Sequence, residues 1–233
     1  MLRAVVFDFD GVIANSEPLH FRAYRDVLAQ DGVELTEPEY YARYLGYDDV
    51  GAFGALAADR GERWDERRVA DLIRRKAARM EELECDQSVL FPGADAAIRR
   101  LAARWPLAIA SGALRAEIVR VLERENLARF FPVLVAAEDA RAGKPAPDPY
   151  VRAVELLSNV ANTPLDAADC VAVEDSRWGL ESARAAGLMT VGVTHTYPAE
   201  ALTGAEAVIP HLDRLTVEFL SKLGQMPRNA APS

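Results

Sequence analysis

The chain has 233 residues, of which 50% are hydrophobic, and its formal net charge is −9. This size allows one large domain, or a domain with a smaller insert, around a substantial core. The acidic balance argues against nucleic acid as a partner, because basic residues drive that binding, and equally against an anionic membrane surface. No apolar stretch approaches the roughly 18 residues that a membrane span needs.

A strand is predicted over 4–7, where a short apolar run leads into an acid. Helical patterns then follow between residues 15 and 87, with no strand pattern among them. Ser16 is expected to cap the first helix, and Thr36 with Glu39 to form a capping box for the second. Four helices are predicted in this segment. The first begins at Ser16, the second begins at Thr36, and the third and fourth cover residues 48–61 and 66–83.

From residue 88 onward, strand and helix patterns alternate. Apolar runs that suit strands buried on both faces occupy 106–110, 132–137, 170–173 and 188–193. Apolar residues three and four apart predict helices over 94–105, 115–126, 149–157 and 176–187. Gly187 is well placed to end the last of these helices. This order predicts an α/β fold, a doubly wound parallel sheet with helices on both faces.

The change of pattern predicts a core domain interrupted by a helical insert. We expect the core to comprise residues 1–14 and 88–223, and the helical insert to comprise residues 15–87. The last segment, 224–233, is small, polar and contains prolines, which predicts a disordered tail.

The two cysteines, Cys85 and Cys170, are far apart in the sequence and belong to no CxxC motif. We interpret them as free thiols in a reducing cytosol rather than as a disulfide or a metal site. The first apolar run meets an acid at Asp8, too early for a secretory signal. The expected location is therefore the cytoplasm, and the expected state is a monomer.

Polar side chains that can do chemistry stand where the predicted strands end. In a parallel sheet, the carboxyl ends of the strands lie along one edge, and ligands bind beyond that edge. Lys144 joins them from the loop that follows the strand over 132–137. The residues expected at this edge are Asp8, Asp10, Ser111, Gly112, Lys144, Glu174 and Asp175.

These acids repel one another strongly if they are close. Two unit charges 4 Å apart interact by about 4 kcal/mol at an effective dielectric constant near 20. A bound Mg²⁺ removes the repulsion, since it takes oxygen ligands from one or two carboxylates and completes its shell with water and phosphate oxygens. Taken singly, the same residues suit a hairpin turn, a helix cap or a solvated loop. Their common position at strand ends favours one site for phosphoryl chemistry.

Four stretches of the sequence resemble the ordered motifs of the haloacid dehalogenase superfamily: "DFDGV", "IASGA", "GKPAPDPY" and "VAVEDSRWGLESARAAG". Their spacing is similar to that of the branch that contains β-phosphoglucomutases and phosphatases, in which a helical cap follows the first motif. The resemblance covers about residues 3 to 222. It implies a Rossmann-like core, Mg²⁺ as the cofactor and a small phosphate ester as the substrate.

The resemblance also implies roles for individual residues. Asp8 corresponds to the nucleophile that forms an aspartyl-phosphate. Asp10 corresponds to the general acid that protonates the leaving oxygen and then to the base that activates water. Ser111 and Lys144 correspond to the groups that hold the phosphoryl oxygens and balance their charge.

The implied metal ligands are Asp8, the backbone carbonyl of Asp10, Asp175 and, directly or through water, Glu174. Asp10 also separates two kinds of substrate. The dehalogenating branch lacks this second aspartate, because a halide leaves without a proton. Asp10 therefore argues for phosphate substrates.

Further residues are expected to contact the substrate or to move the cap. Gly11 lets the backbone turn beside the phosphate, and Asn15 with Ser16 resembles the first cap hinge, with the second near 88–93. His20 and Lys76 match cap positions that couple closure to proton transfer in the mutases. The expected substrate-binding residues are Gly11, Asn15, His20, Lys76, Gly112 and Arg115.

Phosphatase and mutase share this core and differ in the cap. A mutase must clamp a second phosphate, and β-phosphoglucomutases use an arginine that this sequence replaces with Asp48 and Asp49. The segment after Ser111 also lacks the lysine–asparagine pair of the mutases. We therefore predict a phosphatase acting on a sugar phosphate or a phosphoglycolate-like compound. A β-phosphoglucomutase-type mutase is the alternative, and a non-catalytic phosphometabolite-binding protein is a third possibility.

Overall fold

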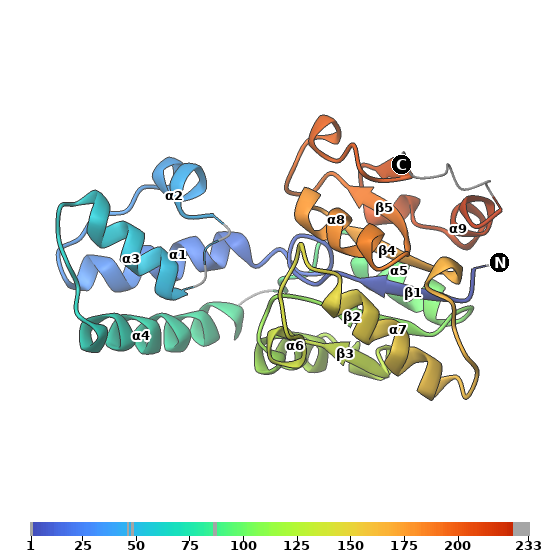
Figure 1. Cartoon of the computed structure of the whole chain (residues 1–233). Coiled ribbons are helices and arrows are strands. Elements are labelled where there is room, and N and C mark those ends of the chain that lie inside the picture. The colour runs from blue at the N-terminus through green and yellow to red at the C-terminus, as the bar shows by residue number, and fades with distance from the viewer. Residues whose placement is uncertain (1, 46, 48, 86–87, 226–233) are drawn as a thin grey trace. The chain divides into compact units, whose positions relative to one another are not determined.

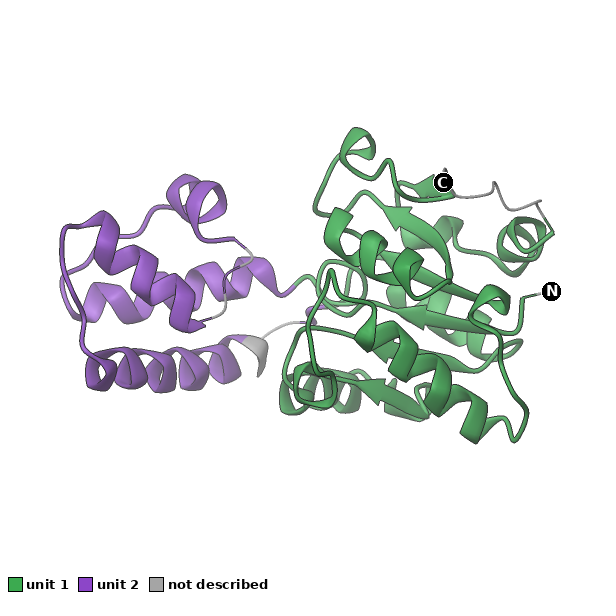
Figure 2. Ribbon diagram, viewed as in Figure 1, with its two compact units in different colours: residues 1–15, 90–233 green, residues 16–89 purple. Residues whose placement is uncertain are grey.

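The computed structural model describes residues 2–45, 47, 49–85 and 88–225. The chain divides into two compact units (Figure 2). The sheet unit contains Met1–Asn15 and Leu90–Ser233, and the helical unit is Ser16–Val89.

The division differs by one or two residues from the predicted boundaries. Asn15, expected in the cap, lies with the sheet unit, whereas Ser88, expected in the core, lies with the helical unit. Backbone pairing explains the difference, because Ala14 bridges both Asp10 and Leu90. The chain is therefore paired within the sheet unit just before the insert, at Ala14, and just after it, at Leu90.

The sheet unit is built on a parallel sheet with the strand order β3-β2-β1-β4-β5-β6 among the described residues (Figure 1). The order reverses beside β1, which makes that strand's carboxyl end the switch point of a doubly wound fold. The strands are β1 (Ala4–Phe7), β2 (Leu107–Ala110), β3 (Val133–Val135), β4 (Cys170–Glu174), β5 (Met189–Val193) and β6 (Ala207–Ile209).

This topology confirms the predicted fold class and the five predicted strands. All residues of β1, β2, β4 and β5 are buried, which is why their sequences show no alternation. The edge strand β6 was not predicted, because its three residues are only partly buried and do not form part of a longer apolar run as those of β3 do.

Helices cover both faces of this sheet (Figure 1). α7 and α8 pack on one face, where alternate strand residues such as Val6 and Ala172 meet Tyr150 and Leu157. Gly187 follows α8 with φ +89°, as expected of a glycine that ends a helix. The helices are α5 (Ala94–Ala102), α6 (Arg115–Arg124), α7 (Asp148–Val160), α8 (Arg177–Ala185) and the unpredicted α9 (Val217–Leu223).

The helical unit contains the predicted helices around an aromatic core. α1 and α3 pack against α4, and the buried cluster includes Tyr24, Tyr40, Phe53 and Leu72. The helices are α1 (Glu17–Gln30), α2 (Glu37–Arg43), α3 (Asp49–Asp59) and α4 (Glu66–Cys85).

Ser16 and Thr36 both occupy the predicted N-cap positions, but only Thr36 makes a side-chain capping hydrogen bond. The hydroxyl of Thr36 accepts from the amide of Glu39 at 3.4 Å, which is one half of the predicted capping box. The side chain of Ser16 makes no capping hydrogen bond. Its backbone is already helical, at φ −79° and ψ −22°, whereas a capping residue needs an extended backbone.

Some predictions fall on residues that the structure does not describe. Asp48, the predicted boundary at residue 87 and residues 226–233 of the expected tail lie outside the described part of the chain. Cys170 is a buried free thiol, as predicted. Among the described residues, no helix combines the length and the hydropathy that a membrane span requires.

Candidate active site

Three acids converge where β1 and β4 end. The two strands are neighbours, with Phe7 opposite Val173, and the amide of Asp8 donates to the carbonyl of Val173 at 3.0 Å. This register places Asp8 beside the end of β4, whose last residue is Glu174 and which is followed by Asp175. One carboxylate oxygen from each acid lies within 4.8 Å of those of the other two, and all three residues are buried. Such a set of hard oxygen donors fits Mg²⁺.

Lys144 connects two of these acids. Its Nζ lies 2.8 Å from Asp8 Oδ1 and 2.6 Å from Glu174 Oε1. Burial opposes the charge on Lys144, but the carboxylates of Asp8 and Glu174 outweigh it and raise the pKa of the ammonium. The hydroxyl of Tyr150 also donates to Glu174 Oε1, at 2.5 Å. Ser176 Oγ donates to the other oxygen, Glu174 Oε2, at 3.4 Å, so Glu174 is held by three donors, and Lys144 is a cation at the centre of the site.

The pKa of the remaining acid, Asp175, indicates that the positive charge of Lys144 does not balance the negative charge of the three carboxylates. Burial, followed by the negative charges of Asp8 and Glu174, raises the pKa of Asp175 to about 8. Burial and the charge of Asp8 also raise the pKa of Glu174. An excess of buried negative charge of this kind is what a bound cation relieves.

Magnesium should therefore stabilise the protein more strongly as the pH rises. Asp175 ionises at about pH 8 in the folded state but near its ordinary value when unfolded, so without metal its contribution to stability is lost as the pH rises towards 8. Mg²⁺ binds the ionised form. We expect Mg²⁺ at about 100 times its Kd to add about 2.7 kcal/mol, or about 5–10 °C in Tm, at about pH 8.5, and much less at about pH 5.5.

Thermal unfolding with and without Mg²⁺ at both pH values measures this effect. Asp175→Asn is the control, since it removes the titrating carboxylate and should abolish most of the Mg²⁺-dependent shift. An equal Mg²⁺ shift at both pH values would contradict the interpretation of the acidic cluster.

Ser111 and the turn after β1 complete the same edge of the sheet. β2 pairs with β1, so Ser111, the residue after β2, lies at the carboxyl edge together with Asp8. Ser111 is buried, and its Oγ accepts a hydrogen bond from the amide of Ala113 at 3.1 Å. Asp10 is half-buried in the turn after β1 and is not one of the three clustered carboxylates. Gly112 follows Ser111 directly and is exposed.

Two glycines allow the acids to approach the backbone. A Cβ on Gly11, whose φ is +76°, would lie 2.0 Å from Asp175 Oδ2. A Cβ on Gly179, in the first turns of α8, would lie 2.0 Å from both carboxylate oxygens of Glu174. Both positions therefore require glycine for close packing.

Gly179→Ala should destabilise the protein, because the new methyl group displaces the buried carboxylate of Glu174. We expect a loss of about 1–3 kcal/mol in the free energy of unfolding, measured by urea denaturation. Gly54→Ala is the matched control in helix α3, since nothing lies within 4 Å of its added Cβ. There the same exchange should stabilise by about 0.5–1 kcal/mol. Equal effects at the two positions would contradict this prediction.

The helical unit brings together two of the predicted substrate-binding residues. Lys76 is only 3% exposed, and its Nζ lies 2.9 Å from His20 Nδ1 and 2.8 Å from Asp49 Oδ1. The hydroxyl of Tyr24 donates to the same oxygen of Asp49 at 2.5 Å. The charge of Lys76 is therefore balanced within the helical unit by Asp49. Asn15, another predicted residue, is exposed at the end of the sheet unit's first segment.

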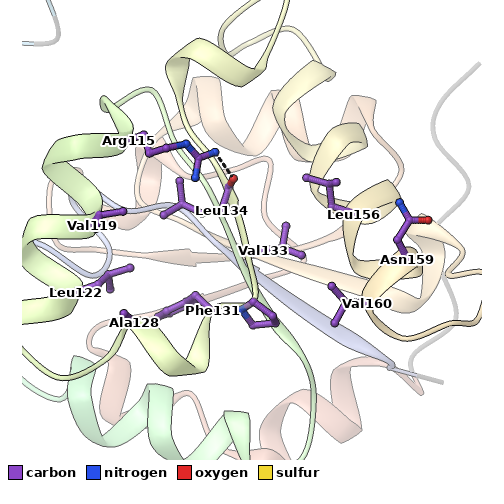
Figure 3. Close-up of a pocket in the computed structure, with 11 residues that line it drawn as sticks. Arg115, Val119, Leu122, Ala128, Phe131, Val133, Leu134, Leu156, Asn159 and Val160 are labelled. Carbon is purple, nitrogen blue, oxygen red and sulfur yellow. Dashed lines mark hydrogen bonds between the residues drawn. The ribbon is translucent and has the colours of Figure 1, made fainter.

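The structure does not bring Arg115 to the acidic cluster. Among the described residues, its guanidinium group donates to the carbonyl of Leu134 at 2.9 Å and pairs with Asp139 at 2.5 Å, and its amide contacts Glu138. It lines an apolar groove of about 430 Å³ beside strand β3 (Figure 3). The expectation missed these partners because Leu134 lies in the edge strand β3, and Glu138 and Asp139 follow that strand rather than β1 or β4.

Sequence reasoning also missed three residues at the site. Tyr150 lies within the "GKPAPDPY" motif, and its hydroxyl contacts Glu174. His195 and Thr196 follow β5. His195 Nδ1 lies 3.0 Å from the carbonyl oxygen of Gly11, and Thr196 Oγ1 and Asp175 Oδ2 both approach the position that a Cβ on Gly11 would take, at 2.9 and 2.0 Å. The sequence offered a signal for His195 and Thr196, since β5 was predicted and its carboxyl end lies at the same sheet edge as those of the other strands.

Relatives with known names match nearly the whole chain. Protein CbbY of Rhodobacter capsulatus is 32% identical over 95% of this chain and 99% of its own length. A phosphorylated carbohydrates phosphatase of Thermotoga maritima is 31% identical over 84% of this chain and 87% of its own. The β-phosphoglucomutase of Bacillus subtilis is 25% identical over 91% of this chain and 94% of its own.

A solved structure and a family model agree with these relatives. The crystal structure of CbbY from Rhodobacter sphaeroides in complex with phosphate aligns with a TM-score of 0.80 and 24% identity, over 95% of this chain and all of that chain, and so shares its fold. The family model described as haloacid dehalogenase-like hydrolase matches residues 2–187. This match spans most of the sheet unit's strands and the whole insert, so the chain belongs to the haloacid dehalogenase-like hydrolases.

Proposed function

We propose that this protein is a Mg²⁺-dependent phosphatase that hydrolyses a small phosphorylated metabolite, either a sugar phosphate or a phosphoglycolate-like compound. The observation that carries the proposal is the buried cluster in which Lys144 bridges Asp8 and Glu174 beside Asp175. It joins a nucleophile, a cation and a metal-ligand set at one sheet edge. The named phosphatase among the relatives supports the same reaction.

In the proposed reaction, Asp8 attacks the phosphorus atom while the bond from phosphorus to the leaving oxygen breaks, and Asp10 gives that oxygen a proton. Water then attacks the aspartyl-phosphate and gives its proton to Asp10. This step releases phosphate and restores the carboxylate of Asp8. Lys144 and Ser111 hold the phosphoryl oxygens during both steps.

The proposed metal ligands are Asp8, Asp175 and the backbone carbonyl of Asp10. Glu174 already accepts from Lys144 and Tyr150, so we assign it contact with the metal through water. When bound, Mg²⁺ neutralises negative charge, so that anionic Asp8 and an anionic phosphate can approach each other.

The helical unit is proposed to act as a cap that excludes bulk water, with hinges at Asn15–Ser16 and near residues 88–93. A cap of this kind favours small metabolites over phosphoproteins. The cytoplasmic location and the monomeric state remain predictions from the sequence. Light scattering coupled to size-exclusion chromatography tests the second of these.

A phosphoglucomutase-type activity is the second candidate. The contact between His20 and Lys76 favours it, because the resemblance assigns these positions to cap residues of the mutases, and the relatives include a β-phosphoglucomutase. Against it stands Asp49, whose carboxylate pairs with Lys76 and would repel a second phosphate. Conversion of β-glucose 1-phosphate to glucose 6-phosphate faster than phosphate release would favour the mutase.

Phosphate release from p-nitrophenyl phosphate, with Mg²⁺ and with a chelator, tests the proposed function. A panel of sugar phosphates, nucleotides and phosphoglycolate then identifies the substrate class. We expect release that depends on Mg²⁺ and a preference for one small phosphate ester. Ligand binding without any Mg²⁺-dependent release across the panel would instead support a non-catalytic phosphometabolite-binding protein.

A further inference from the structure

The loop after β5 contacts the turn after β1 at two points. His195 Nδ1 lies 3.0 Å from the carbonyl oxygen of Gly11. Asp175 Oδ2 and Thr196 Oγ1, the hydroxyl of the next residue, lie 2.0 and 2.9 Å from the position that a Cβ on Gly11 would take, so this hydroxyl is close to the carboxylate of Asp175. A Cβ on Gly11 would lie 2.9 Å from Thr196 Oγ1, so the turn and this loop are in close contact. Neither residue takes part in the steps of the proposed reaction.

The direction of the His195 hydrogen bond is set by its partner. A carbonyl oxygen can only accept, so Nδ1 carries the hydrogen and donates it to Gly11. The amide of Gly11 in turn donates to the carbonyl of Ala14 at 2.9 Å. Both polar backbone atoms of Gly11 are therefore paired, and the turn is held from two sides.

The imidazole of His195 is itself held in place. The ring of Phe91 stacks on it, with the ring centroids 3.9 Å apart and the planes 18° apart. The amide of Phe91 donates to the carbonyl of Ile13 at 2.9 Å, so Phe91 is bound to the same loop as Gly11. His195 thus belongs to a closed set of contacts around the turn that carries Asp10. The ring of His211, which is exposed, has its centroid 6.4 Å from that of His195.

We propose that His195 and Thr196 are positioning residues that hold the Asp10–Gly11 turn and the carboxylate of Asp175 in the geometry needed for Mg²⁺ binding and proton transfer. This inference rests on the proposed function. Neither residue needs to touch the substrate. The hydrogen bond to the carbonyl of Gly11 orients the Gly11–Val12 peptide in the turn that carries Asp10, and the hydroxyl of Thr196 orients Asp175. A displacement of about 1 Å at a reacting group lowers the rate by about 100-fold, so a remote hydrogen bond can matter this much.

Two substitutions of His195 separate its hydrogen bond from its ring. His195→Phe keeps a ring stacked on Phe91 but removes the donor. His195→Asn removes the ring but keeps a donor near the position of Nδ1. We expect His195→Phe to lower kcat about 10- to 100-fold with KM changed less than about threefold, and His195→Asn to keep kcat within about threefold of the wild type. His211→Phe, the same exchange at the neighbouring histidine, should leave kcat unchanged.

The Mg²⁺ affinity of the protein, measured by isothermal titration calorimetry, gives a readout that is independent of turnover. His195→Phe should raise the Kd about tenfold, and Thr196→Val should raise it similarly while Thr196→Ser restores it. Thermal unfolding confirms that each variant is folded.

The outcomes distinguish the two proposals. If the wild type binds Mg²⁺ without releasing phosphate, the proposed function fails and the positioning role is decided by affinity alone. Wild-type kcat and Mg²⁺ affinity in His195→Phe would overturn the inference. An equal loss in His195→Asn and His195→Phe would also overturn it, because the ring rather than the hydrogen bond would then be responsible. A wild type that binds no Mg²⁺ overturns both.

Discussion

Asp8→Asn should reduce kcat for phosphate release by a factor of about 10⁴ or more, because an amide oxygen is a poor nucleophile for phosphorus. The fold should persist. Asp8 Oδ1 accepts from the amide of Phe9 at 2.7 Å and from Lys144 at 2.8 Å, and an asparagine oxygen can accept both hydrogen bonds. Removing one negative charge also relieves the repulsion by Glu174 and Asp175. We therefore expect a Tm without metal that equals or exceeds that of the wild type.

Steady-state phosphate release and thermal unfolding of the same preparations measure these two effects. Asp10→Ala is the informative companion, since the proposal expects it to slow breakdown of the aspartyl-phosphate and to change the pH–rate profile rather than to prevent phosphorylation of Asp8. Release by Asp8→Asn within tenfold of the wild-type rate would refute the assignment of the nucleophile.

Lys144→Met should damage both activity and stability. The ammonium is the cation that contacts Asp8 and Glu174, so its loss leaves buried carboxylates without their partner. Breaking a buried ion pair from one side lowers stability by about 3–5 kcal/mol, which corresponds to a fall of about 6–20 °C in Tm for a domain of this size. The rate should fall by about 10²–10³, the effect of removing one group that stabilises developing charge.

The pH dependence identifies the cause of this destabilisation. The pKa values of Glu174 and Asp175 are raised by burial and by neighbouring acids, so these groups take up protons as the pH falls. The stability lost in Lys144→Met should therefore be smaller at about pH 5 than at about pH 8. Lys222→Met, at an exposed position in the last turn of α9, is the matched control and should change Tm little. A Tm deficit in Lys144→Met that does not vary with pH would mean that lost packing, not uncompensated charge, destabilises the variant.

Local patterns were sufficient to predict the parallel sheet and the helical insert. β1 and β4 are short apolar runs that are buried on both faces, and this environment leaves no polar alternation in the sequence. The acids that end them, Asp8 and Glu174, interrupt these runs where the strands reach the sheet edge. Strand type and the position of chemical groups at strand ends follow from residues that are adjacent in the chain.

Local patterns were insufficient where a side chain's partners are distant in the chain. Arg115 follows the second motif, but its contacts with Leu134 and Asp139 beside β3 could not be predicted from that position, and its role in substrate binding stays a prediction. Ser16 has the right residue type for a cap, yet its backbone is already helical. In both cases, the residue type allows several hydrogen bonds, and the surrounding fold selects one of them.

The sequence by itself determined that this chain forms a doubly wound α/β core with a helical insert, and that acids, a lysine and a serine follow its strands. Only the tertiary structure decided which of these groups meet. Asp8, Lys144 and Glu174 come together because β1 and β4 are neighbours and because the loop that carries Lys144 crosses their ends. The pairing of Lys76 with Asp49, and of His195 with Gly11, depends in the same way on contacts between distant segments. Periodicity is a property of neighbouring residues, whereas a charge cluster depends on distances that only strand order, register and loop path determine.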